Sequence, residues 1–254
     1  MLGYRTFRCP TCRRRFNERT GTPYTELTFP TDVVFLVVLW RLHYTLSLRN
    51  LAEMFLERGI VFSQETVRHW ETQIAPLLTV QLRAKRHGKT GTSWHCDETY
   101  IKVHGRWCYL CRAIDRDGSL VNSMPSEHRD MDAARRFFTQ ALTVVGRAPE
   151  KVTTDGHDAY PRAIRETLGP GVVHRCNQYL NNRIEQDHRG IEQRYYPMRG
   201  FGAFASAARF CVAHDEVRDY FRAATRMNET VPLPIQRALF SARLQELRAL
   251  AGAA

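Results

Sequence analysis

The sequence predicts an α/β protein in which a mixed β-sheet with flanking helices follows an all-α segment. Apolar residues recur at helical spacing through residues 30–88, whereas short apolar runs separated by glycine-containing turns begin at Ser93. The elements after Ser93 are predicted in the order strand, strand, strand, helix, strand, helix, strand, helix. This order indicates a mixed sheet with helices on its faces.

Composition narrows the class of partner. The chain has 254 residues, 43% of them hydrophobic, which is enough for one large domain or two smaller ones. The net charge of +11 indicates a polyanionic partner, and nucleic acid is the leading candidate. A membrane surface is the competing explanation. However, the longest apolar run, Val33–Trp40, is far shorter than the ~20 residues that span a bilayer, so no membrane partner is expected.

The N-terminal arm, residues 1–29, is basic and contains one Cys-x-x-Cys motif. Met1–Gly21 does not have the pattern of a signal peptide, which favours a cytoplasmic location in which the seven cysteines are thiols or metal ligands. Cys9 and Cys12, followed by three arginines, are typical of half a zinc ribbon, and a structural zinc site needs four ligands. Cys108 and Cys111 have the same spacing but are predicted on opposite faces of a strand. Two interpretations of this motif stay open: a weak zinc site at Cys9 and Cys12, or a vestigial zinc knuckle.

Residues 30–90 are predicted to be helical and to bind DNA. One helix is predicted from Pro30 to about Tyr44, a second over Leu48–Arg58 with Ser47 as its cap, and a third from Ser63 through Ile74. Two short helices joined by a glycine-containing turn are typical of a helix-turn-helix, and an ordinary helical bundle is the alternative. Residues 83–89 are interpreted as an exposed basic linker. The predicted DNA contacts in this part of the chain are Gln64, Glu65, Arg68, His69, Lys85, Arg86 and Lys89.

The predicted sheet begins with three strands, Ser93–Val103, Trp107–Ile114 and Leu120–Ser126, joined by tight turns. A helix from Asp130 to about Val144 follows. The remaining elements are a strand over Lys151–Thr154, a helix over Ala159–Leu168, a strand over Gly171–His174, and helices over Asn181–Tyr195, Phe204–Thr225 and Ile235–Ala251.

Three acids have settings that indicate one shared site. Asp97 lies in an otherwise buried strand, Asp155 ends a short strand, and Glu185 opens a helix. Taken singly, each has an ordinary structural interpretation, because acidic side chains are mostly exposed. Together they fit phosphoryl transfer assisted by two divalent cations. The neighbouring acids Glu98, Asp158 and Asp187 are predicted to be structural and to point elsewhere.

Three stretches carry a resemblance to a known family: DETYIKVHGRWCYLCRAID, TTDGHDAY and YLNNRIEQDHRGIEQRYYPMRGF. They resemble the catalytic core of the IS-six family of bacterial insertion-sequence DDE transposases, over residues 31–221. The resemblance implies an RNase H-like, integrase-type fold in which Asp97, Asp155 and Glu185 bind two Mg²⁺ or Mn²⁺ ions. It further implies cleavage at the transposon end and transfer of the freed 3′-OH to target DNA.

The resemblance also implies a domain division and partners. Residues 30–90 would be the helix-turn-helix domain that reads the terminal inverted repeats, residues 91–226 the catalytic domain and residues 227–254 a helical tail. A homodimer is expected because two transposon ends must be held together, in the bacterial cytoplasm and associated with the nucleoid.

The chain departs from the family pattern at two places. Only 29 residues separate Asp155 from Glu185, which we interpret as a shortened loop. Seven residues after Glu185, where the family usually has Lys or Arg, this chain has Glu192. Either Arg189 or Arg194 is predicted to replace that DNA contact, or the copy is impaired. Glu192 and the half zinc knuckle favour one alternative, a catalytically inactive DNA-binding remnant or repressor. A separate alternative is an RNase H-type nuclease.

Overall fold

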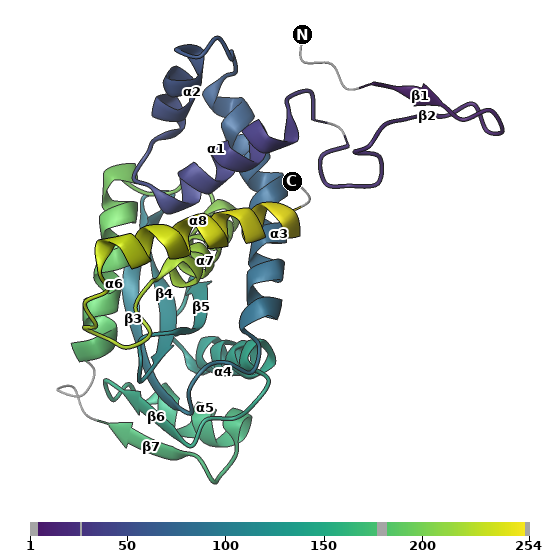
Figure 1. Cartoon of the computed structure of the whole chain (residues 1–254). Helices are drawn as coiled ribbons and strands as arrows, with labels where there is room; N and C mark the ends of the chain where they lie inside the picture. Colours follow the sequence, from purple (N-terminus) through teal and green to yellow (C-terminus); the bar gives the residue numbers. More distant parts are fainter. Residues whose placement is uncertain (1–4, 26, 177–181, 252–254) are drawn as a thin grey trace.

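The computed structural model describes residues 5–25, 27–176 and 182–251. Its centre is a five-stranded sheet in the order β5-β4-β3-β6-β7 (Figure 1). The strands are β3 (Ser93–Val103), β4 (Arg106–Asp115), β5 (Leu120–Ser126), β6 (Lys151–Thr154) and β7 (Val173–Cys176). The first three pair antiparallel, whereas β6 and β7 join β3 in parallel. This order and direction of strands is the RNase H-like arrangement, so the predicted fold class is confirmed.

Helices cover both faces of the sheet. On one face, α4 (Met131–Val145) and α5 (Ala159–Leu168) pack on Trp94, Cys96 and Val152. On the other, α6 (Asn182–Tyr195) and α7 (Phe204–Phe221) pack on residues that include Ile101 and Leu110. Successive side chains of a strand point to opposite faces, which puts the even-numbered residues at the start of β3 on the α4 side. Cys108 and Cys111 belong to different cores, as predicted.

The N-terminal helices are α1 (Thr31–His43), α2 (Leu48–Leu56) and α3 (Gln64–Arg86). Ser47 caps α2 by accepting a hydrogen bond from the Asn50 N–H, and Ser63 caps α3 by accepting one from the Thr66 N–H. Both predicted starts are confirmed. These helices share one hydrophobic core with the sheet and with α7, which includes Trp70 and Phe210. The helical segment therefore packs directly on the sheet and on α7.

The length of α3 was predicted wrongly. It continues through Pro76 to Arg86, because Leu78 and Leu82 are buried in the core shared with α7. The predicted exposed basic linker over residues 83–89 is therefore wrong at its start. Arg83 and Arg86 both pair with Glu216 of α7, whose side chain is fully buried.

The remaining elements lie outside the sheet. β1 (Phe7–Arg8) and β2 (Arg15–Phe16) form a small hairpin, and the short 3-10 helix η2 (Tyr196–Met198) follows α6. α8 (Leu233–Leu250) contacts α7 and lies across the molecule in Figure 1. The predicted strand over Gly171–His174 begins two residues later, because the turn at Gly169 extends to Val172. The predicted start of α6, Asn181, lies outside the described residues.

No helix in the described ranges combines the length and apolar character needed to cross a membrane.

Candidate active site

The acidic site lies where β6 stops and the edge of β3 becomes free. Pairing between β3 and β6 ends at His95 and Thr153. Asp97 is two residues further along β3, and Asp155 directly follows the last residue of β6. Oxygen atoms of Asp97, Glu98 and Asp155 all lie within 4.8 Å of one another. The prediction that folding brings Asp97 and Asp155 together thus agrees with the geometry.

Glu98 was predicted to point elsewhere, and this prediction is wrong. Its side chain projects from the face of β3 that α4 covers, and there the Tyr160 hydroxyl donates a hydrogen bond to one of its carboxylate oxygens. The strand edge is open beyond β6, so a carboxylate from either face can reach the same space. An acid directly after Asp97 at a strand edge was the available sequence signal.

Arg129 lies between two of the acids. Its Nη2 atom donates to Glu98 Oε2 at 3.0 Å and to Asp155 Oδ2 at 2.8 Å. The Asp155 Oδ1 atom also accepts a hydrogen bond from the His157 N–H at 3.2 Å. A cationic side chain therefore partly neutralises the cluster, and sequence reasoning did not identify it.

Glu185 lies in the first turn of α6 and is exposed. It is outside the group of mutually close ligand atoms, but its charge acts on Asp97. Burial is the main cause that raises the pKa of Asp97 to about 7, and the charges of Glu98, Asp155 and Glu185 raise it further. A hydrogen bond from the Glu98 backbone acts in the opposite direction. A cation bound beside Asp97 would therefore stabilise the ionised form of its carboxyl group.

The donor set fits a hard divalent cation. Asp97, Glu98 and Asp155 offer carboxylate oxygens, the ligand type that suits Mg²⁺ and Mn²⁺. Three carboxylates so close together repel one another, and because Arg129 contacts only Glu98 and Asp155, a further cation would reduce this repulsion. The geometry thus supports a metal site, with Glu185 near enough to contribute charge.

Comparison with known proteins identifies the family. The family model of the IS240-type transposase DDE domain matches residues 91–224. The transposase for the insertion sequence-like element IS431mec of Staphylococcus aureus is 38% identical over 170 residues, which cover 65% of this chain and 75% of that protein. The chain belongs to the IS-six family of DDE transposases. A second S. aureus relative, the transposase for IS257 in transposon Tn4003, is 36% identical over 170 residues, which cover 65% of this chain and 75% of that protein.

Solved structures give a more distant likeness. The HTLV-2 integrase catalytic core domain in complex with magnesium, in its dimeric form, matches with a TM-score of 0.41 and 14% identity. The match covers 57% of this chain and 96% of that one. The simian T-cell lymphotropic virus intasome matches with a TM-score of 0.39 and 16% identity, over 51% of this chain and 49% of that one.

In this IS-six transposase, the departure at Glu192 has a structural explanation. The Glu192 carboxylate accepts a hydrogen bond from the Thr99 hydroxyl at 2.9 Å, so it is held against β3. Arg189 is exposed on α6 and stays a predicted DNA contact. Arg194 does not occupy the missing position, because its Nη2 atom donates to the Arg41 carbonyl at 2.5 Å and the side chain is buried. The prediction that Arg194 replaces the family's basic residue is wrong.

Asp187 is structural in the transposase, in agreement with the prediction. It pairs with Arg112 at 2.7 Å and with Arg218 at 2.6 Å, and these two cations hold the pKa of its carboxyl well below the usual range against the effect of burial. Asp158 is exposed at the residue before α5. Neither acid belongs to the candidate metal site.

The predicted DNA contacts on α3 differ in their surroundings. Gln64, Arg68 and His69 are exposed on its first two turns. Lys85 pairs with Glu246, whereas Lys89 is exposed. Arg86 bonds both oxygens of Glu216 and the carbonyls of Leu120 and Val121, so its prediction as a DNA contact is wrong.

Cys9 and Cys12 lie at the turn of the β1-β2 hairpin. The Cys12 N–H lies 3.5 Å from Cys9 Sγ, and this hydrogen bond is the main cause that lowers the pKa of the Cys9 thiol. Within residues 5–25, 27–176 and 182–251, the two thiols are not part of a group of three or more metal-ligand side chains. A zinc site there stays a prediction.

Proposed function

We propose that this insertion-sequence transposase binds the terminal inverted repeats of its element and catalyses metal-dependent DNA strand cleavage and strand transfer. The observation that carries the proposal is the cluster of carboxylates at the free edge of β3, in which the pKa of Asp97 is raised to about 7. A cluster of mutually repelling acids, one of them with a raised pKa, is typical of sites that bind cations.

Asp97 and Asp155, with Glu98 or Glu185 as the third acid, would hold Mg²⁺ or Mn²⁺ ions, and we propose two. Such a pair of ions activates an attacking oxygen and stabilises the leaving oxygen of a phosphodiester. The chain itself positions these acids by strand pairing, by the Tyr160 and Arg129 contacts to Glu98, and by the α6 helix that carries Glu185.

DNA binding is proposed for the exposed start of α3. Gln64, Arg68 and His69 lie on consecutive turns of a capped helix that follows a short helix and a turn, as in a helix-turn-helix. The net charge of +11 supports attraction of DNA over a distance. Because the described part of each copy carries one such acidic cluster and an element has two ends, we propose that a homodimer acts.

Strand transfer by purified protein tests the proposal. The substrate is a duplex that carries the terminal inverted repeat of the element encoding this chain, with a supercoiled plasmid as target and Mg²⁺ or Mn²⁺ added. We expect Asp97→Asn to lower strand transfer at least a hundredfold, because it removes a charged ligand, while duplex binding is unchanged. Asp158→Asn, which removes an exposed acid outside the cluster, is the matched control and should stay active.

Three outcomes would overturn the proposal. Strand transfer that survives in Asp97→Asn would remove the cluster from the chemistry. If the wild-type protein binds the duplex but does not cleave it in the presence of either Mg²⁺ or Mn²⁺, the chain is a catalytically inactive DNA-binding protein. Faster cleavage of an RNA–DNA hybrid than of duplex DNA would identify an RNase H-type nuclease.

A further inference from the structure

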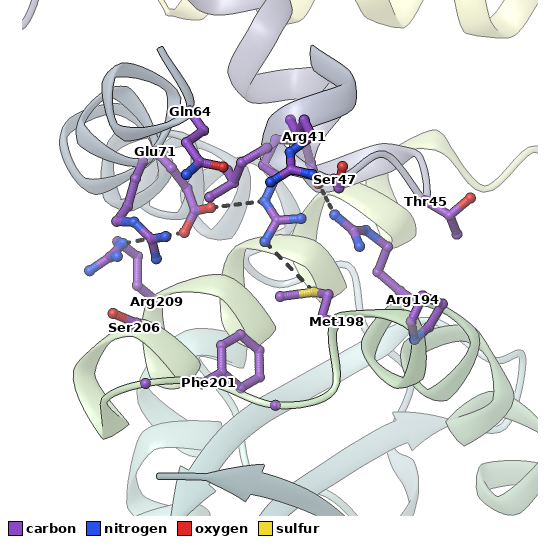
Figure 2. A pocket seen from close by; sticks show the side chains of 16 residues that line it. Arg41, Thr45, Ser47, Gln64, Glu71, Arg194, Met198, Phe201, Ser206 and Arg209 are labelled. Carbon is purple, nitrogen blue, oxygen red and sulfur yellow. Dashed lines mark hydrogen bonds and ion pairs between the residues drawn. The ribbon is translucent and has the colours of Figure 1, made fainter. Parts of the chain in front are cut away.

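A pocket of about 460 Å³ lies between the N-terminal helices and the end of the catalytic core, away from the acidic cluster. Figure 2 shows Arg41 from α1, Glu71 from α3, Arg194 from α6 and Arg209 from α7 around it. The volume is within the range of about 300–1,000 Å³ that is typical of ligand sites. We call this space the arginine pocket.

Positive charge in the arginine pocket exceeds negative charge. Five arginines line it, and Glu71 is the single acid in its lining. Glu71 Oε2 accepts from Arg41 Nε at 3.2 Å, and its Oε1 lies 3.6 Å from Arg209 Nε, beyond normal hydrogen-bonding distance. One carboxylate is thus shared between two guanidinium groups.

Arg194 has no acidic partner of its own in the described part of the chain. Its side chain is 3% exposed, its Nη2 atom donates to the carbonyls of Arg41 and Leu46, and its Nε atom has no hydrogen-bond partner. Arg41, 6% exposed, lies beside it, and both guanidinium carbons are within 5 Å of the Phe210 ring centre, at 4.8 and 4.9 Å.

This arrangement is unfavourable unless an anion joins it. Burial and the neighbouring Arg41 lower the pKa of Arg194 to about 9, which is a large displacement for a group that stays protonated in proteins. A buried charge without a counter-charge is strongly destabilising, whereas a bidentate anion satisfies several guanidinium donors at once.

The walls of the arginine pocket indicate which anion fits. Gln64 and Arg68 line it, and both belong to the exposed start of α3 that we propose to contact DNA. Ser47 and Leu48, at the N-terminus of α2, also line it, and helix N-termini attract phosphate. A duplex held by α3 would bring its own backbone to the mouth of this pocket.

We propose that the arginine pocket binds a backbone phosphate of the transposon-end DNA that α3 holds, through Arg41, Arg194 and Arg209. This inference rests on the proposed DNA binding and adds a second contact point, between the helix-turn-helix and the catalytic core. Because a phosphate is common to all sequences, the contact contributes affinity and position rather than sequence recognition. The pocket would thereby fix the orientation of α3-bound DNA relative to β3.

The test measures binding to duplexes that carry the terminal inverted repeat, each with one phosphate replaced by a neutral methylphosphonate. For the wild-type protein, we expect one or two adjacent positions near the α3 contact to weaken binding about tenfold or more. In Arg194→Met and Arg209→Gln, the same replacement should weaken binding less than about threefold, because the partner is already lost. Arg237→Gln, on the exposed start of α8, is the matched control and should keep the wild-type pattern.

Salt dependence gives a second measurement. The logarithm of the association constant falls as the logarithm of the salt concentration rises. In each variant this dependence should be shallower, with the magnitude of the slope reduced by about one, equally for the repeat and for an unrelated duplex. Since Arg194 is buried, its variant is first checked by circular dichroism. If Arg194→Met is unfolded, Arg209→Gln carries the test, because that side chain is 16% exposed.

Two outcomes would overturn the inference, and they differ from failure of the proposed function. Full methylphosphonate sensitivity in the variants, or binding and salt slopes equal to the wild-type values, would show that the arginine pocket holds no phosphate while DNA binding stands. A wild-type protein that binds no duplex under any condition would overturn both.

Discussion

The Nη2 atom of Arg129 lies 2.8 Å from Oδ2 of Asp155, inside the group of acids that we propose to bind metal. The same nitrogen lies 3.0 Å from Glu98 Oε2. Arg129 and a divalent cation therefore compete for the same oxygens, because a carboxylate lone pair cannot serve both fully. Glu98 and Asp155 are thus paired with a cation from the chain itself.

Removing this cation should tighten metal binding. We expect Arg129→Gln to lower the apparent dissociation constant for Mn²⁺ about tenfold, because the acids lose a competitor and keep their mutual repulsion. Isothermal titration calorimetry on the DNA-free protein measures it. Arg135→Gln, which removes an arginine that pairs with Asp132 and Glu166 instead, is the control. Weaker Mn²⁺ binding in Arg129→Gln would mean that the arginine supports the metal site.

Glu98 and Glu185 should separate metal binding from catalysis. Glu98 lies within the group of close ligand atoms, whereas Glu185 does not. In the DNA-free protein we expect Glu98→Gln to weaken Mn²⁺ binding about tenfold and Glu185→Gln to change it less than about threefold. Glu185→Gln should nevertheless abolish strand transfer, as expected for the family's third acid. Equal effects of both variants on Mn²⁺ binding would contradict the distinction.

Local signals in the sequence predicted much of this fold. The caps Ser47 and Ser63 act within one turn of their own helices, and strand alternation assigned Cys108 and Cys111 to different cores. β3, β5 and β6 have the predicted bounds. Each of these features depends on residues that are close in the chain.

Contacts between distant residues explain the failures. Arg83 and Arg86 looked like an exposed linker because their partner, Glu216, is 130 or more residues away in the sequence. Arg194 was expected to replace the family's basic residue at position 192 of α6, but its side chain is buried against the Arg41 carbonyl of α1 and lines the arginine pocket instead. For Glu98, alternation gave the correct face of β3 and missed that β6 stops short, which opens the edge to both faces.

Breaking the buried ion pairs beneath α6 should strongly destabilise the fold. Arg112, 1% exposed, pairs with Asp215 and Asp187, and Arg218 pairs with Asp187. We expect Asp215→Asn to lower the free energy of unfolding by about 3–5 kcal/mol, because it leaves a buried guanidinium without one of its counter-charges. Urea titration measures the change. Glu65→Gln, which breaks an exposed ion pair with Arg68, should have a much smaller effect, and similar losses in both variants would contradict the argument.

Protonation of His214 should account for part of the loss of stability at acidic pH. This side chain is 4% exposed, its Nδ1 atom lies 2.8 Å from the Leu42 carbonyl, and burial is the main cause that lowers its pKa to about 4. The pKa of a histidine in the unfolded chain is ~6.5, and above this pH the contribution of a histidine with a lowered folded-state pKa to stability is fully present. That contribution is lost as the pH falls toward the pKa in the folded protein. Between pH 7.5 and 4.5 the loss should be about 2–3 kcal/mol, since the unfolded chain binds the proton first.

The matching variant is His214→Asn, because an asparagine amide can still donate to the Leu42 carbonyl. We expect it to lower stability at pH 7.5, since it loses the stacking on Phe210, and to flatten the dependence of unfolding free energy on pH below 6.5. Urea titrations at several pH values compare the two slopes. If the variant keeps the full wild-type slope, the loss of stability at acidic pH comes from other groups. One of them is His188, because burial lowers the pKa of its imidazole to about 3.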